Sequence, residues 1–92
     1  MILPSSITGD GNYYTTISPN TRYKFLTMGA TGSTVIRGQY TYNGLTGDYD
    51  GLAFTGIAGG AEFLSATDTL NVYAAGVGAS PISVIVEPIR LK

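Results

Sequence analysis

The sequence lacks the side chains on which most enzymes depend. Its 92 residues include no histidine, no cysteine and no tryptophan, and only five basic and six acidic residues. Histidine and cysteine supply much of the acid–base and nucleophilic chemistry found near neutral pH. Their absence excludes disulfides, thiol redox motifs, and metal sites built from thiolates or imidazoles. We therefore expect a protein that is not an enzyme, with no catalytic residues and no cofactor.

Charge is scarce as well. Charged residues make up 12% of the chain and the formal net charge is −1, whereas soluble domains usually carry about 25% charged residues. Nucleic-acid binding needs several basic groups on one face. No apolar run approaches the ~18 residues of a membrane span, and residues 1–6 lack the basic and apolar regions of a secretory signal. We expect neither nucleic acid nor a membrane as a partner.

Short β-prone runs separated by glycine fill the chain, which has 13 glycines. Alternation of apolar and polar residues predicts strands with one buried face. In the clearest run, 69–75, Leu70, Val72 and Ala74 are expected to face inward. We expect strands at 11–17, 23–28, 34–42, 52–57, 69–75 and 81–89, a possible first strand at 6–8, and a short run of uncertain type at 61–64.

These runs predict the fold class. Turn signals every eight to twelve residues are typical of a sandwich or barrel, and no window shows a helical apolar period. A chain of this length forms one domain. The sequence thus predicts an all-β protein, a single-domain antiparallel β-sandwich or jelly-roll-like fold of seven or eight short strands over residues 7–92, preceded by an N-terminal arm at 1–6.

Two local arrangements follow from turn chemistry. Residues 18–21, Ser-Pro-Asn-Thr, favour a turn, so we expect the runs at 11–17 and 23–28 to pair as an antiparallel hairpin. Residues 43–51 are polar and punctuated by glycine, which indicates a loop.

The run at 34–42 is too long for a small domain if it is straight, because nine extended residues span about 30 Å. We expect a bulge or bend at Gly38. Exposed sheet edges need protection against pairing with other chains, and Lys24, Arg37 and Arg90 are the expected edge guards.

The acidic segment Asp48-Tyr49-Asp50-Gly51 invites comparison with calcium loops, since hard cations take clustered carboxylates. An EF-hand loop places a glutamate eleven positions after its first aspartate, where this chain has Gly59. A solvated turn is therefore the favoured interpretation, and no metal site is predicted. A site completed by Glu62 or Asp68 stays open.

Seven tyrosines raise the question of a carbohydrate-binding surface. Flat rings stack on sugars, but tyrosine is also a good strand residue that suits half-buried surfaces and subunit contacts. Packing or interface roles are favoured. The alternative function is a small carbohydrate-binding module using exposed tyrosines, with Tyr49 as its first candidate glycan contact.

The arm at 1–6 carries two large aliphatic residues, Ile2 and Leu3, before Pro4, which holds the preceding residue extended. Free termini commonly fray. The other interpretation is an arm that docks on a neighbouring subunit, with Ile2 and Leu3 as the candidate interface residues.

Five segments of short strands and turns carry a resemblance that covers most of the chain, at 8–13, 18–25, 32–35, 66–73 and 82–86. With these segments, the chain resembles small β-proteins encoded among tailed-phage structural genes. The resemblance implies a protein of the virion, such as a capsid decoration protein, a head fibre base or a small tail component. Such proteins are commonly oligomers, with a trimer favoured here, and their partners are copies of themselves and other virion proteins. No catalytic residues are implied.

Overall fold

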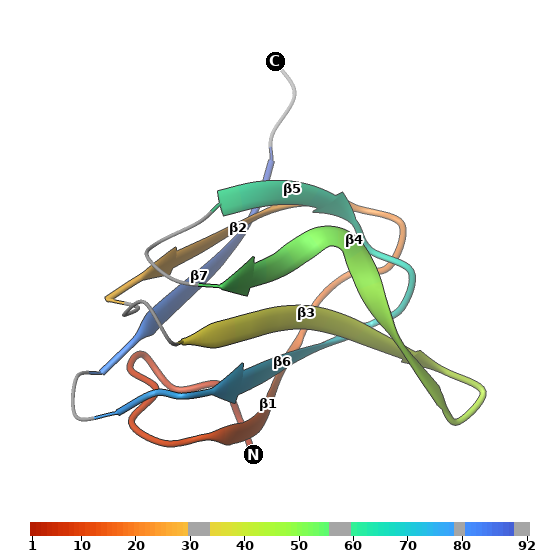
Figure 1. The fold of residues 1–92 in the computed structure, drawn as a ribbon. Helices are drawn as coiled ribbons and strands as arrows, with labels where there is room; N and C mark the ends of the chain where they lie inside the picture. Colours follow the sequence, from red (N-terminus) through yellow and green to blue (C-terminus); the bar gives the residue numbers. More distant parts are fainter. Residues whose placement is uncertain (30–33, 56–59, 79–80, 90–92) are drawn as a thin grey trace.

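The computed structural model describes residues 1–29, 34–55, 60–78 and 81–89, except for the side chains of Asp50 and Thr55. Within these ranges, seven strands form two antiparallel sheets (Figure 1). The order is β1-β6-β3-β4 in the larger sheet and β5-β2-β7 in the smaller. The strands are β1 (Gly11–Thr16), β2 (Arg22–Met28), β3 (Val35–Tyr42), β4 (Leu45–Thr55), β5 (Gly60–Leu64), β6 (Thr69–Ala75) and β7 (Ser83–Pro88).

The all-β sandwich prediction is confirmed, while the jelly-roll variant of it stays a prediction. Within the ranges described there is no helix of the length and apolarity that a membrane span requires. The run at 61–64 is a strand, and the run at 52–57 is the end of β4 as far as residue 55, its last two residues lying outside the described part.

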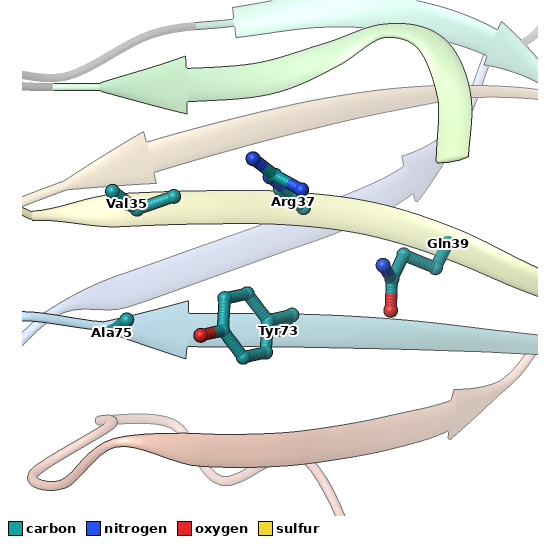
Figure 2. A pocket seen from close by; sticks show the side chains of 5 residues that line it. All are labelled: Val35, Arg37, Gln39, Tyr73 and Ala75. Atoms are coloured by element: carbon teal, nitrogen blue, oxygen red, sulfur yellow. The ribbon is translucent and has the colours of Figure 1, made fainter. Parts of the chain in front are cut away.

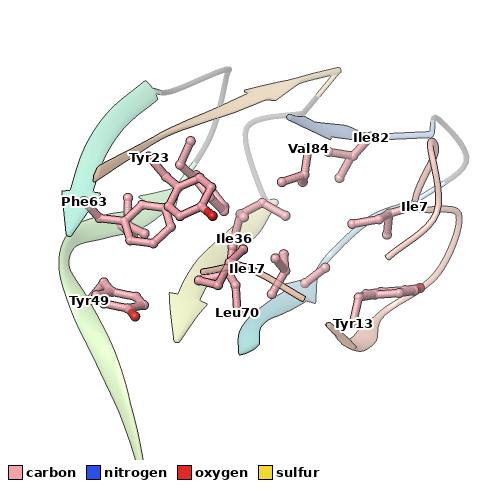
Figure 3. Close-up of a cluster of buried hydrophobic side chains, with 14 of the residues drawn as sticks. Ile7, Tyr13, Ile17, Tyr23, Ile36, Tyr49, Phe63, Leu70, Ile82 and Val84 are labelled. Atoms are coloured by element: carbon pink, nitrogen blue, oxygen red, sulfur yellow. The ribbon is translucent and has the colours of Figure 1, made fainter. Parts of the chain in front are cut away.

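The core lies between the two sheets, with Tyr23, Tyr49 and Phe63 gathered on one side of it and mainly aliphatic side chains, together with Tyr13, on the other (Figure 3). Leu70, Val72 and Ala74 are fully buried, as their alternation predicted. The aromatic part packs around Phe63, whose ring centroid lies 5.7 Å from that of Tyr23 and 4.7 Å from that of Tyr49. Burial of apolar area at these inward positions is the main force holding the sheets together.

The expected hairpin between the runs at 11–17 and 23–28 is wrong. β1 pairs with β6 and β2 pairs with β5 and β7, so the two strands lie in different sheets. Residues 18–21 cross from one sheet to the other. Each run has an apolar face that must be buried, formed by Tyr13 and Ile17 in one run and by Tyr23 and Phe25 in the other. Because the runs lie in opposite sheets, these two faces both point into the core between them.

A second crossing, between β5 and β6, is tied to the first through Ser65. The Ser65 side chain is buried, and its hydroxyl accepts the Thr21 N–H at 2.8 Å and lies 2.6 Å from the Ser18 carbonyl oxygen. The backbones join as well, because Asn20 N–H donates to the Ser65 carbonyl and Ser65 N–H donates to the Thr21 carbonyl. Two sheet crossings far apart in sequence thus share one hydrogen-bonded corner.

The loop expected at 43–51 is wrong for most of its length, because β4 begins at Leu45. Only Asn43 and Gly44 form the turn, with φ of 52° and 78°. Two successive residues with positive φ are the requirement of a type I′ turn, which joins antiparallel strands tightly and favours Asn-Gly. The glycines at 47 and 51 lie within the strand.

The irregularity expected at Gly38 is confirmed, and its extra residues belong to the partner strand. Gln39 pairs with Asp48 and Arg37 pairs with Ala53, so residues 49–52 of β4 all stand opposite Gly38. A Cβ at Gly38 would lie 2.6 Å from Leu52 Cδ1 and 3.0 Å from Leu52 Cβ. The bulge turns β4 sharply toward β5 (Figure 1).

The expected edge guards are wrong where the structure describes them. Lys24 lies on β2 and Arg37 on β3, both inner strands of their sheets, and Arg90 lies outside the described residues. Residues 1–7 instead contact the edge of the larger sheet at β1 and the residue before β7 in the smaller sheet. Leu3 N–H donates to the Tyr14 carbonyl of β1, and Ile7 pairs with Ile82. The possible strand at 6–8 is therefore a single bridge.

Replacing Gly38 with alanine tests the close approach of β4. We expect Gly38→Ala to lower the free energy of unfolding by about 1–3 kcal/mol, because the added methyl overpacks against Leu52 near its backbone. Chemical denaturation measures this. Gly9→Ala is the matched control, since nothing lies within 4 Å of a Cβ there. Equal stability of the two variants would contradict the described bulge.

Candidate functional site

The acidic side chains that the structure describes, which exclude that of Asp50, do not gather in one place. Asp48 accepts a hydrogen bond of 2.8 Å from Gln39 Nε2 and lies 3.9 Å from Arg37, while Glu62 lies 3.9 Å from Arg22. Among the residues that the structure describes, no three of the His, Cys, Asp and Glu type gather as metal ligands would. The structure does not bring Asp48 together with Glu62 and Asp68, the partners considered from the sequence.

Tyr49 is not the exposed ring that the sequence indicated. Its side chain is 7% exposed and packs in the core, with its ring centroid 4.9 Å from that of Tyr40. The hydroxyl accepts the Ala66 N–H at 2.8 Å. The prediction failed because it placed Tyr49 in a loop, whereas the β4 bulge turns this residue inward. Tyr49 therefore offers no platform for a sugar.

The outer face of the larger sheet carries a row of polar side chains that crosses all four strands. Asn71 Nδ2 donates to Asn12 Oδ1 at 3.1 Å and to Gln39 Oε1 at 2.9 Å, and Gln39 in turn donates to Asp48. The row links β1, β6, β3 and β4 by side chains alone. Such cross-strand pairs add roughly 0.2–1 kcal/mol each and help to hold the strands in register.

Next to this row lies a shallow depression of about 410 Å³ (Figure 2). Tyr73 of β6 and Arg37 of β3 are opposite each other in the register and border it together with Gln39. Val35 and Ala75 form its apolar end. A half-exposed ring, a guanidinium and an amide make a surface suited to a flat polar ligand.

All but one of the large exposed apolar side chains in the described part of the chain lie in three separate patches. The arm patch consists of Met1, Ile2 and Tyr14, at the outer edge of β1. The hairpin tip consists of Tyr42 and Leu45, which pair across the Asn43-Gly44 turn and are 63% and 76% exposed. The sheet patch consists of Leu26 and Met28, on the outer face of the smaller sheet, whereas Leu64 pairs with Arg22 at the other end of β2 and lies apart from them.

The structure separates the two candidate interface residues of the arm. Ile2 is 71% exposed, whereas Leu3 is partly buried against the core of its own domain. The Met1 carbonyl accepts the Tyr14 N–H at 2.8 Å, so the arm is paired to β1 on both sides of Ile2. Ile2 is presented outward by a backbone held in place, and Leu3 serves the fold.

The other patches carry signals that the sequence interpretation passed over. The Asn-Gly pair marks a tight hairpin, which would have placed Tyr42 and Leu45 at its tip. Alternation in 22–28, with Tyr23 and Phe25 inward, would have placed Leu26 and Met28 outward. The position of Leu64 depends on the pairing of β2 with β5, which no single sequence pattern gives, and this pairing sets Leu64 opposite Arg22, apart from Leu26 and Met28.

Comparison of the chain with protein families, with curated proteins and with solved structures found no match.

Substitutions in the arm test the division of roles between its two residues. We expect Leu3→Lys to lower the free energy of unfolding by about 1–3 kcal/mol, because a partly buried aliphatic side chain is lost. Ile2→Lys should leave stability within about 0.5 kcal/mol of the original, as exposed substitutions do. Thermal unfolding of the two variants measures the difference, and equal losses would contradict the described placement of the arm.

Proposed function

We propose that this chain is a non-enzymatic structural protein of a phage virion, a capsid decoration protein or another virion-surface component that assembles as an oligomer. Its partners are further copies of itself and other virion proteins. The observation that carries the proposal is the presence of three separate apolar patches on one small domain.

The patches suit a subunit with several neighbours. Exposed apolar residues that lie next to one another commonly mark interaction sites when the patch is large, and aromatic residues and methionine are enriched in protein interfaces. A standard interface takes about 800 Å² from each partner. Three such contacts would cover less than half of the 5484 Å² that the chain exposes, so one domain of this size has room for all of them.

The sequence resemblance to tailed-phage structural proteins supports the same function. The chemistry of the surface agrees with it, since Asp48 and Glu62 are each beside a basic partner and Asp10 accepts the Val77 N–H at 3.0 Å. These carboxylates stabilise the fold locally. A structural role makes no further demand on them.

Light scattering coupled to size-exclusion chromatography tests the proposal. We expect the purified chain to form an oligomer, with a trimer favoured. Ile2→Lys, Leu45→Lys and Met28→Lys each place a charge in one exposed patch. If a patch forms a contact, the variant that carries its charge should have a lower assembly mass or assemble more weakly, with an unchanged circular dichroism spectrum. Thr16→Lys, on the exposed face of β1, is the matched control.

The result that contradicts the proposal is a monomer at high micromolar concentration that also fails to bind capsids. If the chain is an oligomer whose mass is unchanged by all three substitutions, the assembly is real but the patches do not form its contacts. Capsid binding is measured separately, by co-sedimentation of the chain with purified phage heads. This measurement tests the virion role independently of self-association.

The second candidate function is carbohydrate binding at the depression on the larger sheet. It is favoured by one observation, the Tyr73 ring beside Arg37 and Gln39 in that depression (Figure 2). Ring faces stack on sugars, while guanidinium and amide groups donate hydrogen bonds to hydroxyl groups. This surface takes the place of Tyr49 in the carbohydrate alternative.

A glycan array tests the alternative. If the depression binds a sugar, Tyr73→Ala should abolish the signal, whereas Tyr42→Ala, at the hairpin tip, should keep it. A silent array with the unmodified chain removes this function. Binding that survives Tyr73→Ala would place the sugar elsewhere.

A further inference from the structure

We propose that the β3–β4 hairpin joins two copies of this chain, by antiparallel pairing of the free edge of β4 in one copy with the same edge in the other, centred on Thr46. The inference rests on the proposed assembly function and names one contact within it. A two-fold contact of this kind can link single chains or larger oligomers.

The hairpin extends beyond the sheet as a two-stranded ribbon (Figure 1). β6 pairs with β3 only as far as Gln39, and the ladder between β3 and β4 continues from there to the Tyr42–Leu45 pair. In the described part of the chain, no third strand flanks residues 40–42 or 45–47. An isolated two-stranded ribbon is marginally stable in water, so a partner strand would stabilise it.

The register shows which backbone groups are free for pairing. Tyr42 and Leu45 flank a two-residue turn and so face each other as a hydrogen-bonded pair. Along an antiparallel strand these positions alternate. The N–H and C=O of the next residue of β4, Thr46, therefore point away from β3 and toward open space at the sheet edge.

Unlike the edge of β1 and the start of β7, this edge has no backbone partner in the described part of the chain. The arm pairs with β1, and Ile7 bridges to Ile82 next to β7. β5 lies beside β4 on the far side of the bulge (Figure 1). Residues 40–47 contain no charged residue and no proline, which are the usual devices against edge pairing.

Side chains at this edge favour a second copy with Thr46 at the two-fold axis. In that register, Leu45 lies opposite Gly47 of the partner subunit. A Cβ at Gly47 would lie 3.0 Å from the Tyr40 ring, so the ring covers that glycine and would meet the incoming leucine. Thr46 faces its own copy, and cross-strand threonine pairs are favourable.

The positions of charged residues favour the same register, with the two-fold axis at Thr46. Shifting the axis to Asp48 would set two carboxylates opposite each other, whereas an axis at Thr46 places Asp48 opposite Gly44 of the partner subunit. Identical uncharged ribbons meet without repulsion. A two-fold contact also closes on itself and does not propagate into fibres, which suits a defined assembly.

Single-cysteine cross-linking tests the proposal cleanly, because the chain has no cysteine of its own. In a hydrogen-bonded antiparallel pair the Cα atoms are about 5.5 Å apart, within disulfide range. We expect Thr46→Cys to form a covalent dimer under mild oxidation. Thr41→Cys is the matched control: Thr41 and Thr46 lose the same 3.2 Å hydroxyl contact, but the two copies of residue 41 would be about three strand spacings apart, roughly 14 Å.

A disulfide in the full-length Thr46→Cys variant and none in Thr41→Cys supports the contact. Cross-linking of Thr41→Cys alone would place the pairing on the edge of β3, and equal cross-linking of both would show random collision; each overturns the proposal. If the original chain is an oligomer by light scattering but Thr46→Cys stays uncoupled, this contact is wrong and the proposed function stands. If the original chain neither associates nor binds capsids, the proposed function itself fails.

Discussion

The arrangement of this domain depends on the close approach of Leu52 to Gly38. Any side chain at position 38 would meet Leu52, so only glycine lets four residues of β4 stand opposite one residue of β3. The bulge carries Tyr49 into the core, where its hydroxyl accepts the Ala66 N–H. Ala66 follows Ser65, the residue that ties the two sheet crossings together. The bulge at Gly38 is thus connected, through Tyr49 and Ala66, to the hydrogen-bonded corner at Ser65 where the chain passes between the two sheets.

The same bulge separates the part of the molecule that folds from the part that projects. On the turn side of the bulge, β3 and β4 form a two-stranded ribbon. One face of this ribbon is apolar and continues the core-facing side of the larger sheet beyond the sandwich. After the bulge, β4 turns toward β5 and helps to close the domain (Figure 1). The arm closes the opposite side while presenting Ile2 to solvent. Closure on both sides leaves the apolar patches and the ribbon edge exposed, and the proposed assembly depends on these surfaces.

The fold class and several local features could be predicted from the sequence, because they depend on neighbours along the chain. Alternation identified the inward side of β6, and glycine identified the irregularity in β3. Strand partners could not be predicted this way: residues 18–21 have turn chemistry that serves a hairpin and a crossing equally well, and burial on both sides decides between them. Tyr49 was misplaced for a related reason, since glycines at 47 and 51 indicated a loop where they permit a bulged strand. The arm patch could not be predicted either, because Ile2 and Tyr14 come together only through the pairing of the arm with β1.

A structural role in assembly accounts for a chain with sparse reactive chemistry, a small closed core and apolar residues in three separate places. Hydrogen exchange measured residue by residue at low and high protein concentration tests this account most directly, because exchange at an edge amide slows when the amide becomes paired or buried. The account predicts concentration-dependent protection at Thr46 on the ribbon edge, with no change at Asn71 and Tyr73 on the polar face. Protection that is the same at all concentrations, or that appears first on the polar face, would contradict it.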